Sequence, residues 1–394
     1  MTDPLGQSQV IPYIVGLTRL GYQFHLLSVE KKDRLAERGP SIRAMLEKQG
    51  IRWTTLNFSS RPPVLAKFYD QWKLNRKVAA ICRDESIDMV HARSYISAAA
   101  ALQVTKKTGI PFLFDMRGFW VDERVDSGLW NLKNPIYRYA YRVFKKKEKR
   151  YLAVATHIIS LTHKAKEELV QAYGVGADKI TVIPCCADLD LFDYNKIDSK
   201  QKEELRKNLG IGASMSVLTY LGSLGGWYLT DEMLRFFSVW LKRKPDAVFL
   251  LITQDSRERV LRATARYGIP AERVRVQPAS RGEVPGYLAI SDWSVFFIKD
   301  AYSKKASSPT KQGEIMAMGI PIVCNDIGDT GRIVKESGTG VVVTDFTDAE
   351  LEKAADTCWG RSYDPKHIRD AALQYYDLKE GVVRYERVYK MMAP

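Results

Sequence analysis

The sequence predicts two doubly wound α/β domains that face a cleft. With 394 residues, the chain is too long for one ordinary core and suits two domains of about 150–200 residues each. Short apolar runs alternate with longer helical patterns, and this alternation occurs in both halves. Strands of about four to six residues between helices of about ten or more indicate βαβ units around a parallel sheet.

In the first half, the expected strands are short apolar runs with polar ends, at 24–29, 89–91, 112–115 and 157–161. Helical patterns lie between them at 8–20, 41–49, 68–85 and 96–108. A strand that contains Pro184 ends this half within 182–192, and a polar, lysine-rich linker follows at 196–207.

The start of the chain departs from the expected pattern. A doubly wound domain opens on an apolar strand that leads into the first glycine turn, whereas this chain opens directly on Asp3–Ser8, with Gly6 in the place of that turn. Two explanations stay open: the start codon is misplaced, or the first domain lacks a central strand.

The second half repeats the scheme. Strands are expected at 217–220, 248–252, 274–277, 295–298 and 322–325, and helices at 231–243, 256–267, 283–290, 310–318 and 349–357. We therefore predict an N-terminal domain over 1–193 and a C-terminal domain over 194–377. The closing helix in 378–394 is expected to pack back on the first domain.

Composition places the chain among globular proteins. Hydrophobic residues make up 45% and charged residues 27%, which are ordinary values. No apolar run approaches the roughly 20 residues that span a bilayer, and no segment near the start has the layout of a secretory signal. The five cysteines form no CxxC pair, so neither a zinc site nor a disulfide framework is indicated. We expect a cytoplasmic protein without a bound metal.

The charge indicates an anionic partner. The net charge is +14, and residues 1–195 hold 30 Lys and Arg against 20 Asp and Glu, whereas residues 196–394 hold 30 against 26. Such an excess suits a nucleic acid, a phosphorylated substrate or an anionic lipid surface. No nucleic-acid-binding module is recognisable, so we predict no nucleic-acid partner.

A basic helix is expected over 134–152. Arg138, Arg142, Lys145 and Lys149 form one stripe along it, and Ile136, Ala140, Val143 and Phe144 form an apolar side. The stripe is either a solvated face or a surface for docking on anionic lipid. The second interpretation predicts a peripheral protein at the inner face of the membrane.

The strongest candidate site is the segment 307–323. Ser308 is expected to cap a helix whose first residue is Pro309. The start of a helix offers free N–H groups and a partial positive charge, and Lys311 adds a full charge, so a diphosphate fits here together with Thr310. One turn on, the carboxylate of Glu314 can accept hydrogen bonds from the two hydroxyls of a ribose. The alternative is a plain capped helix before a buried strand.

A glycine loop follows the first strand of the second domain. Gly222, Ser223 and Gly225 lie in this strand-to-helix turn, where glycines let backbone N–H groups approach phosphate oxygens. Such turns are common, but this one is expected at the same sheet edge as the start of the helix at 310.

Two strand ends in the first half carry polar residues. Asp115, Arg117, Gly118 and Trp120 follow one strand, and His91 and Arg93 follow another. Charged residues and a tryptophan beside a glycine are unusual for a connector. Structural roles, as a surface ion-pair network or a buried histidine, remain the alternative.

The order of these segments resembles the retaining GT-B glycosyltransferases, in particular glycosyltransferase family 4. The resemblance rests on the Gly6 turn, Asp88-Met89-Val90-His91, the hinge at 182–192, the Gly222 loop and the segment 308–323. It implies that the C-terminal domain holds a UDP- or GDP-linked sugar and the N-terminal domain an acceptor, a sugar or a lipid-linked diphosphate. By position, Glu314 matches the second glutamate of the family's E-x7-E motif, which binds the ribose. Lys311, Thr310, Gly222 and Gly225 match its diphosphate contacts.

The chain also departs from the family. The first glutamate of that motif is replaced by Ala306, the cations usual after the glycine loop are absent, and Arg117 stands where the family has a histidine. Gly6, Arg93, Gly118 and Trp120 are acceptor-side candidates, and the catalytic candidates are Lys311, Arg117, Asp115 and His91.

The resemblance implies a hexosyltransferase of cell-surface polysaccharide or glycolipid synthesis that needs no metal. We expect the sugar to be transferred on the same face, with retention of its configuration, through an ion pair. The departing diphosphate helps to deprotonate the acceptor hydroxyl. The alternative is a nucleotide-sugar 2-epimerase, which needs acid and base groups but no acceptor groove.

Overall fold

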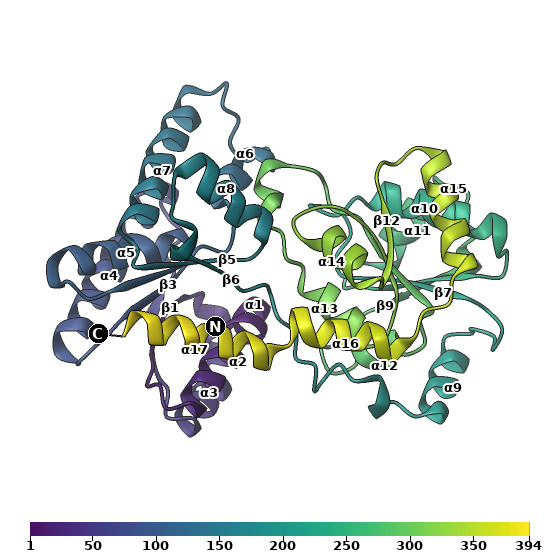
Figure 1. The fold of residues 1–394 in the computed structure, drawn as a ribbon, viewed down its shortest axis with the longest axis horizontal. Coiled ribbons are helices and arrows are strands. Elements are labelled where there is room, and N and C mark those ends of the chain that lie inside the picture. The colour runs from purple at the N-terminus through teal and green to yellow at the C-terminus, as the bar shows by residue number, and fades with distance from the viewer. Residues whose placement is uncertain (394) are drawn as a thin grey trace. The chain divides into compact units, whose positions relative to one another are not determined.

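The computed structural model describes residues 1–393 and divides into two compact units. Unit 1 comprises Met1–Cys185 and the segment from Leu378 onward, and unit 2 comprises Cys186–Asp377. The division therefore falls before Cys186, and not after residue 193 as the sequence suggested. The closing helix α17 (Leu378–Met392) belongs to unit 1 and packs on α2 (Ile11–Arg19), as Figure 1 shows. Both units are α/β, so the predicted fold class is confirmed.

Unit 2 is built on a six-stranded parallel sheet. Its strand order is β12-β11-β10-β7-β8-β9, so the winding direction changes between β7 and β10. The strands are β7 (Val217–Leu221), β8 (Val248–Ile252), β9 (Val274–Gln277), β10 (Trp293–Phe296), β11 (Ile322–Asn325) and β12 (Gly340–Val343). Ligands of doubly wound sheets bind at the carboxyl ends of the strands beside such a switch point.

The helices of unit 2 cover this sheet. They are α9 (Ser199–Asn208), α10 (Thr230–Arg243), α11 (Arg257–Ala265), α12 (Val284–Leu288), α13 (Thr310–Ala317), α14 (Thr330–Ser337), α15 (Asp348–Gly360) and α16 (Pro365–Tyr376). The prediction of a linker over 196–207 was wrong. Most of that segment is α9, which Asp198 and Gln201 start with a reciprocal capping box; this pattern is readable in the sequence.

Unit 1 holds two separate parallel sheets. One pairs β1 (His25–Glu30) with β2 (Arg52–Asn57). The other has the order β3-β4-β5-β6, with β3 (Val90–Arg93), β4 (Phe112–Asp115), β5 (His157–Ser160) and β6 (Ile180–Val182). The helices are α1 (Pro4–Gln9), α2, α3 (Lys32–Lys48), α4 (Pro63–Asp84), α5 (Ser94–Thr108), α6 (Trp120–Asp126), α7 (Pro135–Val154), α8 (His163–Tyr173) and α17.

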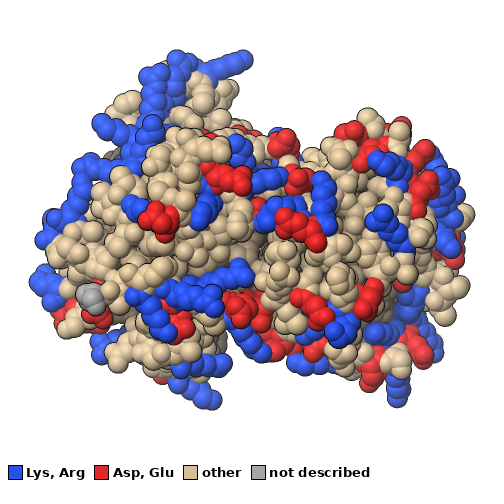
Figure 2. Space-filling model, in the orientation of Figure 1, with Lys and Arg blue, Asp and Glu red and all other residues tan. Residues whose placement is uncertain are grey.

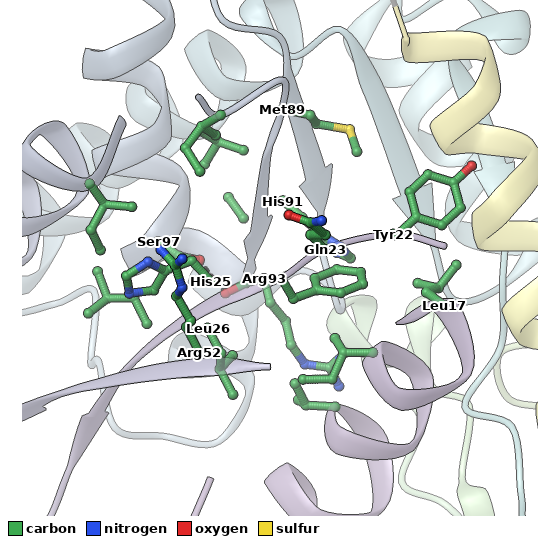
Figure 3. A pocket seen from close by; sticks show the side chains of 18 of the residues that line it. Leu17, Tyr22, Gln23, His25, Leu26, Arg52, Met89, His91, Arg93 and Ser97 are labelled. Carbon is green, nitrogen blue, oxygen red and sulfur yellow. Dashed lines mark hydrogen bonds between the residues drawn. The ribbon is translucent and has the colours of Figure 1, made fainter. Parts of the chain in front are cut away.

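A cavity of ≈ 1500 Å³ lies in unit 1. It is lined by the edge strands β1 and β3 and by α2, and Figure 3 shows His25 and Leu26 of β1 across from His91 and Arg93 of β3. Within residues 1–393, no strand precedes β1, and the chain opens on α1. Gly6 therefore lies inside a helix, packed against Met1, and not in the glycine turn that the sequence suggested.

The basic helix is present as α7, but its stripe is not one continuous surface. Asn134 caps α7 by accepting a hydrogen bond from the N–H of Ile136. Lys145 turns inward and binds Asp122 (2.9 Å) and the buried Glu148 (2.5 Å). Ile136, assigned to the apolar side, is 73% exposed. Figure 2 shows Lys and Arg gathered over the part of unit 1 where Figure 1 places α7. None of the described helices is long and apolar enough to cross a membrane.

Candidate functional site

Lys311 is the central residue of the candidate site in unit 2. It is the second residue of α13, and its ammonium nitrogen Nζ is buried without a hydrogen-bond partner in residues 1–393. Nζ lies 3.6 Å from the centre of the Tyr228 ring and 4.5 Å from that of Tyr220. The two rings give it a cation–π environment but no counter-charge.

Gly222 lies directly against this ammonium group. A Cβ placed on Gly222 would be 2.8 Å from Nζ of Lys311, and the backbone φ of +123° suits glycine alone. Gly222 follows β7, whereas α13 follows β10 in the chain, so the switch point of the sheet brings these two predicted residues together.

Burial lowers the pKa of Lys311 to about 7, and the neighbouring carboxylate of Glu314 only partly opposes this shift. A buried ammonium group that lacks an ion-pair partner loses hydration that no protein group replaces. An anion beside Nζ would supply that partner and would favour the charged form.

Glu314 lies one turn further along α13 and is 7% exposed. Its Oε1 accepts a hydrogen bond of 2.8 Å from Nη1 of Arg281. Burial raises the pKa of Glu314, with Arg281 and Lys311 acting in the opposite direction. Sequence reasoning missed Arg281, because it lies in the loop after β9 and only the folded sheet brings it to α13.

The glycine loop is less free than the sequence suggested. The N–H of Gly222 donates to the carbonyl of Ile252, that of Leu224 to Asp255, and that of Gly225 to the hydroxyl of Thr230. The exposed Ser223 uses its carbonyl to accept from the Tyr220 hydroxyl. The backbone of Gly222 lies close to Lys311, and the N–H groups named above stabilise the loop itself.

The start of α13 also differs in detail from the prediction. The capping position is Pro309, which has no side-chain cap, and Thr310 is the first helical residue. Ser308 therefore lies one residue before the cap. The assignment of Ser308 as the cap was wrong, because the chain is still extended at Pro309, with φ −73° and ψ 121°.

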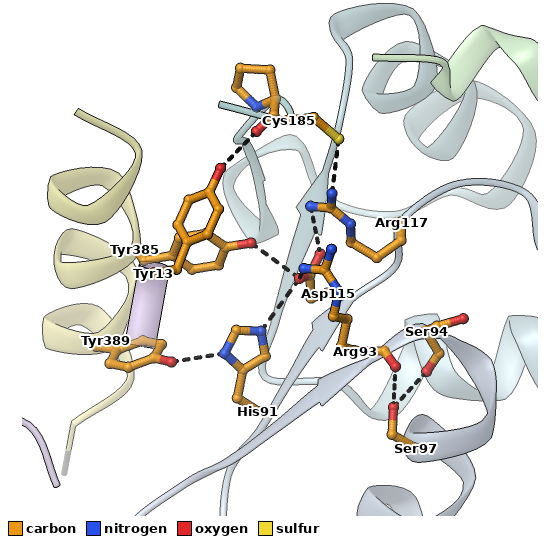
Figure 4. A network of polar contacts seen from close by, with 11 residues as sticks. Tyr13, His91, Arg93, Ser94, Ser97, Asp115, Arg117, Cys185, Tyr385 and Tyr389 are labelled. Carbon is orange, nitrogen blue, oxygen red and sulfur yellow. Dashed lines mark hydrogen bonds and ion pairs between the residues drawn. The ribbon is translucent and has the colours of Figure 1, made fainter. Parts of the chain in front are cut away.

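The candidates in unit 1 form a cluster around Asp115, shown in Figure 4. Asp115 ends β4 and is fully buried. Its Oδ2 lies 3.1 Å from Nη1 of Arg93 and 3.6 Å from Nε2 of His91, and its Oδ1 lies 3.7 Å from Nη1 of Arg117. Burial alone would raise the pKa of Asp115, but Arg117 and Arg93 hold it well below its usual range.

Two tyrosines of α17 complete this cluster. The hydroxyl of Tyr385 donates to Oδ2 of Asp115 (3.1 Å), and the hydroxyl of Tyr389 lies 2.8 Å from Nδ1 of His91. The sequence indicated that this helix returns to the first domain, but it gave no reason to place either tyrosine in the site.

Arg117 is held in a constrained backbone conformation. Its φ is +59°, and the next residue, Gly118, has φ +117°. The Arg117 guanidinium also lies 2.9 Å from Sγ of Cys185. A non-glycine residue at positive φ costs free energy and persists where the surrounding structure fixes it, so the turn aims the guanidinium at Asp115.

Trp120 lies apart from the charged cluster. It packs edge-on against Trp130 and Phe144, and the guanidinium of Arg124 lies over its ring at 4.8 Å. These contacts give Trp120 a packing role beside α7.

The chain matches two models of protein families. Residues 10–191 match the model described as Glycosyltransferase Family 4, and residues 216–360 match the one described as Glycosyl transferases group 1. Together they cover most of both units.

Individual curated relatives are only distantly similar in sequence. The chain is 26% identical over 262 residues to a putative teichuronic acid biosynthesis glycosyltransferase of Bacillus subtilis, covering 64% of this chain and 56% of that protein. It is 24% identical over 223 residues to a D-inositol 3-phosphate glycosyltransferase of Nocardia farcinica, covering 54% and 47%. The chain thus spans about half the length of these relatives.

Solved structures show the same fold. A glycosyltransferase from Rickettsia africae superposes with a TM-score of 0.70 at 18% identity, over 99% of this chain and 96% of that one. Anabaena Alr3699/HepE, solved in complex with UDP and glucose, superposes with a TM-score of 0.65 at 16% identity, over 93% of this chain and 99% of that one.

Proposed function

Because this chain belongs to glycosyltransferase family 4, with a GT-B fold, we propose that it transfers a sugar from a nucleotide-sugar to an acceptor hydroxyl with retention at the anomeric carbon. The observation that carries this proposal is the buried ammonium of Lys311, which has no ion-pair partner among the described residues and lies against Gly222 at the switch point of a parallel sheet. A diphosphate supplies the missing negative charge.

In the donor site, each residue of α13 has a separate task. Lys311 binds the diphosphate, with Thr310 and the first N–H groups of α13 beside it. Glu314 binds the ribose hydroxyls, and Arg281 fixes its orientation through Oε1. A UDP-linked or GDP-linked sugar suits this arrangement, and the UDP complex of Alr3699/HepE favours the uridine form.

During transfer, the bond between the anomeric carbon and the diphosphate oxygen breaks first, which leaves a sugar cation paired with the diphosphate. The acceptor hydroxyl attacks from the same face, and its proton passes to the departing diphosphate. Negative charge grows on the diphosphate as the bond breaks, so the ammonium of Lys311 stabilises the transition state more than the ground state. No step requires a metal ion.

In unit 1, Arg117 and Arg93 are the groups that bind the acceptor. A guanidinium can bind a phosphate or carboxylate through two parallel hydrogen bonds. Asp115 and His91 act as positioning residues, because Asp115 is fully buried and paired with these cations. A lipid-linked diphosphate or an acidic sugar is the acceptor class that fits.

Together with the teichuronic acid biosynthesis named for the Bacillus subtilis relative, this chemistry favours synthesis of a polysaccharide or glycolipid at the inner face of the membrane. Arg117→Ala tests the acceptor assignment. It should lower turnover with an anionic acceptor much more than the hydrolysis of the donor in water. If turnover on the true substrate pair is unchanged, Arg117 is structural.

A thermal-shift panel of nucleotides tests the donor site directly. A ligand at 100 times its dissociation constant adds about 2.7 kcal/mol of stability, so UDP or GDP should raise the melting temperature of the wild type. Lys311→Ala should abolish this shift, and Lys335→Ala, which removes an exposed lysine of α14, should keep it. If no nucleotide or nucleotide-sugar shifts the wild type, the proposal is wrong. Incubation with donor alone would reveal an epimerase by isomerisation of the sugar.

A further inference from the structure

Helix α4 carries large apolar side chains on its outer face. Leu65, Phe68, Tyr69 and Trp72 follow the i, i+3, i+4, i+7 spacing of one helix face, and they are 67%, 70%, 54% and 50% exposed. The opposite face is buried in unit 1 through Ala66, Leu74 and Ile81. A surface helix normally places polar residues outward, so these four residues, the α4 aromatic face, are an exposed apolar patch that needs an occupant.

Basic residues are frequent in the segment that carries the α4 aromatic face. Residues 61–77 contain five Lys and Arg and a single acidic residue, Asp70. The Asp70 carboxylate is already bound by Lys73 (2.7 Å) and by the N–H of Ser59 (2.8 Å). Hence the face presents apolar surface with an excess of positive charge.

The aromatic rings of this face contact each other and nearby cations. Tyr69 and Trp72 are stacked with centroids 5.9 Å apart. Nζ of Lys73 lies 4.7 Å from the Tyr69 ring, and the guanidinium of Arg76 lies 4.8 Å from the Trp72 ring. The Arg76 guanidinium lies over the face of the Trp72 ring, from which its charge can reach a phosphate, whereas Lys73 is held by Asp70 and by the carbonyl of Asn57.

We propose that the α4 aromatic face inserts into the headgroup region of an anionic lipid bilayer. Tyrosine and tryptophan are enriched at membrane interfaces, and lysine and arginine beside them bind lipid phosphates. The excess of positive charge favours an anionic bilayer as the partner over a protein surface that carries few acidic residues. This inference rests on the proposed function in one respect: membrane binding would bring unit 1 close to a lipid-linked acceptor.

The sequence indicated α7 as the lipid-binding element, and the structure separates the two helices. On α7, Lys145 is bound by Asp122 and Glu148 and is removed from the basic stripe. The large exposed apolar residues of α7 lie in its first turns, where Ile136 and Tyr139 are 73% and 71% exposed. They serve as a matched control on the same unit, with exposure at least as large as that of Phe68 and Trp72.

Co-sedimentation of the full chain with vesicles of equal parts phosphatidylglycerol and phosphatidylcholine tests the proposal without donor or acceptor. The wild type should bind, and pure phosphatidylcholine vesicles should bind it at least about tenfold more weakly. The double variant Phe68→Ser/Trp72→Ser should lose about tenfold or more in partitioning at every salt concentration, because it removes apolar contact. Ile136→Ser/Tyr139→Ser should bind within about twofold of the wild type.

Arg76→Gln should weaken binding at low salt and have little effect at high salt, since charge attraction to the bilayer is screened. The proposal is overturned if the α4 double variant binds vesicles like the wild type. It is equally overturned if only the α7 pair reduces binding, or if sedimentation velocity shows a dimer that the α4 variant dissociates while vesicle binding persists.

Folding and donor binding serve as independent readouts. Since both side chains are exposed, Phe68→Ser/Trp72→Ser should melt within a few degrees of the wild type and keep its UDP-induced shift. A missing UDP shift in the wild type would contradict the proposed function and would leave the vesicle result intact.

Discussion

Two clusters of buried charge, one in each unit, solve the same electrostatic problem in opposite ways. In unit 1, the buried carboxylate of Asp115 has Arg93, His91 and Arg117 within 3.7 Å. In unit 2, the buried ammonium of Lys311 has aromatic rings around it and no carboxylate within ion-pair distance in residues 1–393. The carboxylate in unit 1 is compensated by the fold itself, whereas the ammonium in unit 2 would be compensated only by a bound anion. An uncompensated buried charge is therefore the more informative mark of a ligand site.

The largest effect is expected from breaking the compensated cluster. Asp115→Asn leaves the half-buried cations of Arg93 and Arg117 without their counter-charge, and breaking a buried ion pair typically costs about 3–5 kcal/mol. The melting temperature of the variant should fall steeply, and chemical denaturation should give the free energy. Tyr385→Phe removes one hydrogen bond from the same carboxylate and should cost only about 1 kcal/mol. If Asp115→Asn were as stable as the wild type, the carboxylate of Asp115 would not be needed to balance the charges of Arg93 and Arg117.

Lys311→Ala should have the opposite pattern. The variant should melt at or above the temperature of the wild type, because a buried cation without a partner is removed. The kcat should fall by about 10²–10³-fold, the effect of losing one preorganised electrostatic contact in a transition state. Steady-state kinetics with a matched donor and acceptor would measure it. A higher KM for the donor at unchanged kcat would show that Lys311 binds the ground state only.

Glu314→Gln should act mainly on donor binding. The ribose is bound equally in the ground and transition states, so the KM for the donor should rise by about 10–100-fold, as for a lost hydrogen bond to a charged group, with a smaller change in kcat. Arg281→Ala should reproduce part of this effect, because Arg281 orients Glu314. An unchanged KM in both variants would mean that this carboxylate pair is structural.

The pH dependence of donor binding sharpens the comparison further. The pKa of Lys311 lies near 7 in the folded protein, below its unfolded value of about 10.4. The unfolded chain therefore binds more protons between these values, so the stability of the free protein relative to Lys311→Met should rise from pH 7 toward pH 10. Binding of UDP selects the protonated amine and should weaken by up to about tenfold for each pH unit above 7. Calorimetry at pH 8 in buffers of different ionisation enthalpy should detect proton uptake, and its absence would exclude Lys311 as the titrating group.

Much of the candidate donor site could be predicted from the sequence, because its residues lie in short continuous segments. Lys311 and Glu314 share one helix, and Gly222 follows a strand, so local spacing places each correctly. Arg281 could not be predicted, since its contact with Glu314 depends on the order of strands in the sheet. The sequence also did not show that N–H groups of the glycine loop are already hydrogen-bonded, because their partners, such as Asp255 and Thr230, come from neighbouring turns.

In unit 1 the sequence was less informative. It marked Asp115, Arg117, His91 and Arg93 as strand-end residues, but Tyr385 and Tyr389 reach them from the far end of the chain. On α7, helical periodicity could not tell that Lys145 meets buried carboxylates. The sequence indicated no role for the helix at 68–85, since periodicity does not show which face of a helix the core covers.

The sequence by itself determined that this protein is a two-domain α/β chain, where most of its strands and helices lie, and which short segment is the candidate donor site. These properties follow from the local periodicity of apolar residues and from the chemistry of adjacent side chains. Only the tertiary structure decided which charges are compensated and which face of each amphipathic helix is left in solvent. Both depend on groups brought together from distant parts of the chain, because charges interact through space and burial is set by what packs on top.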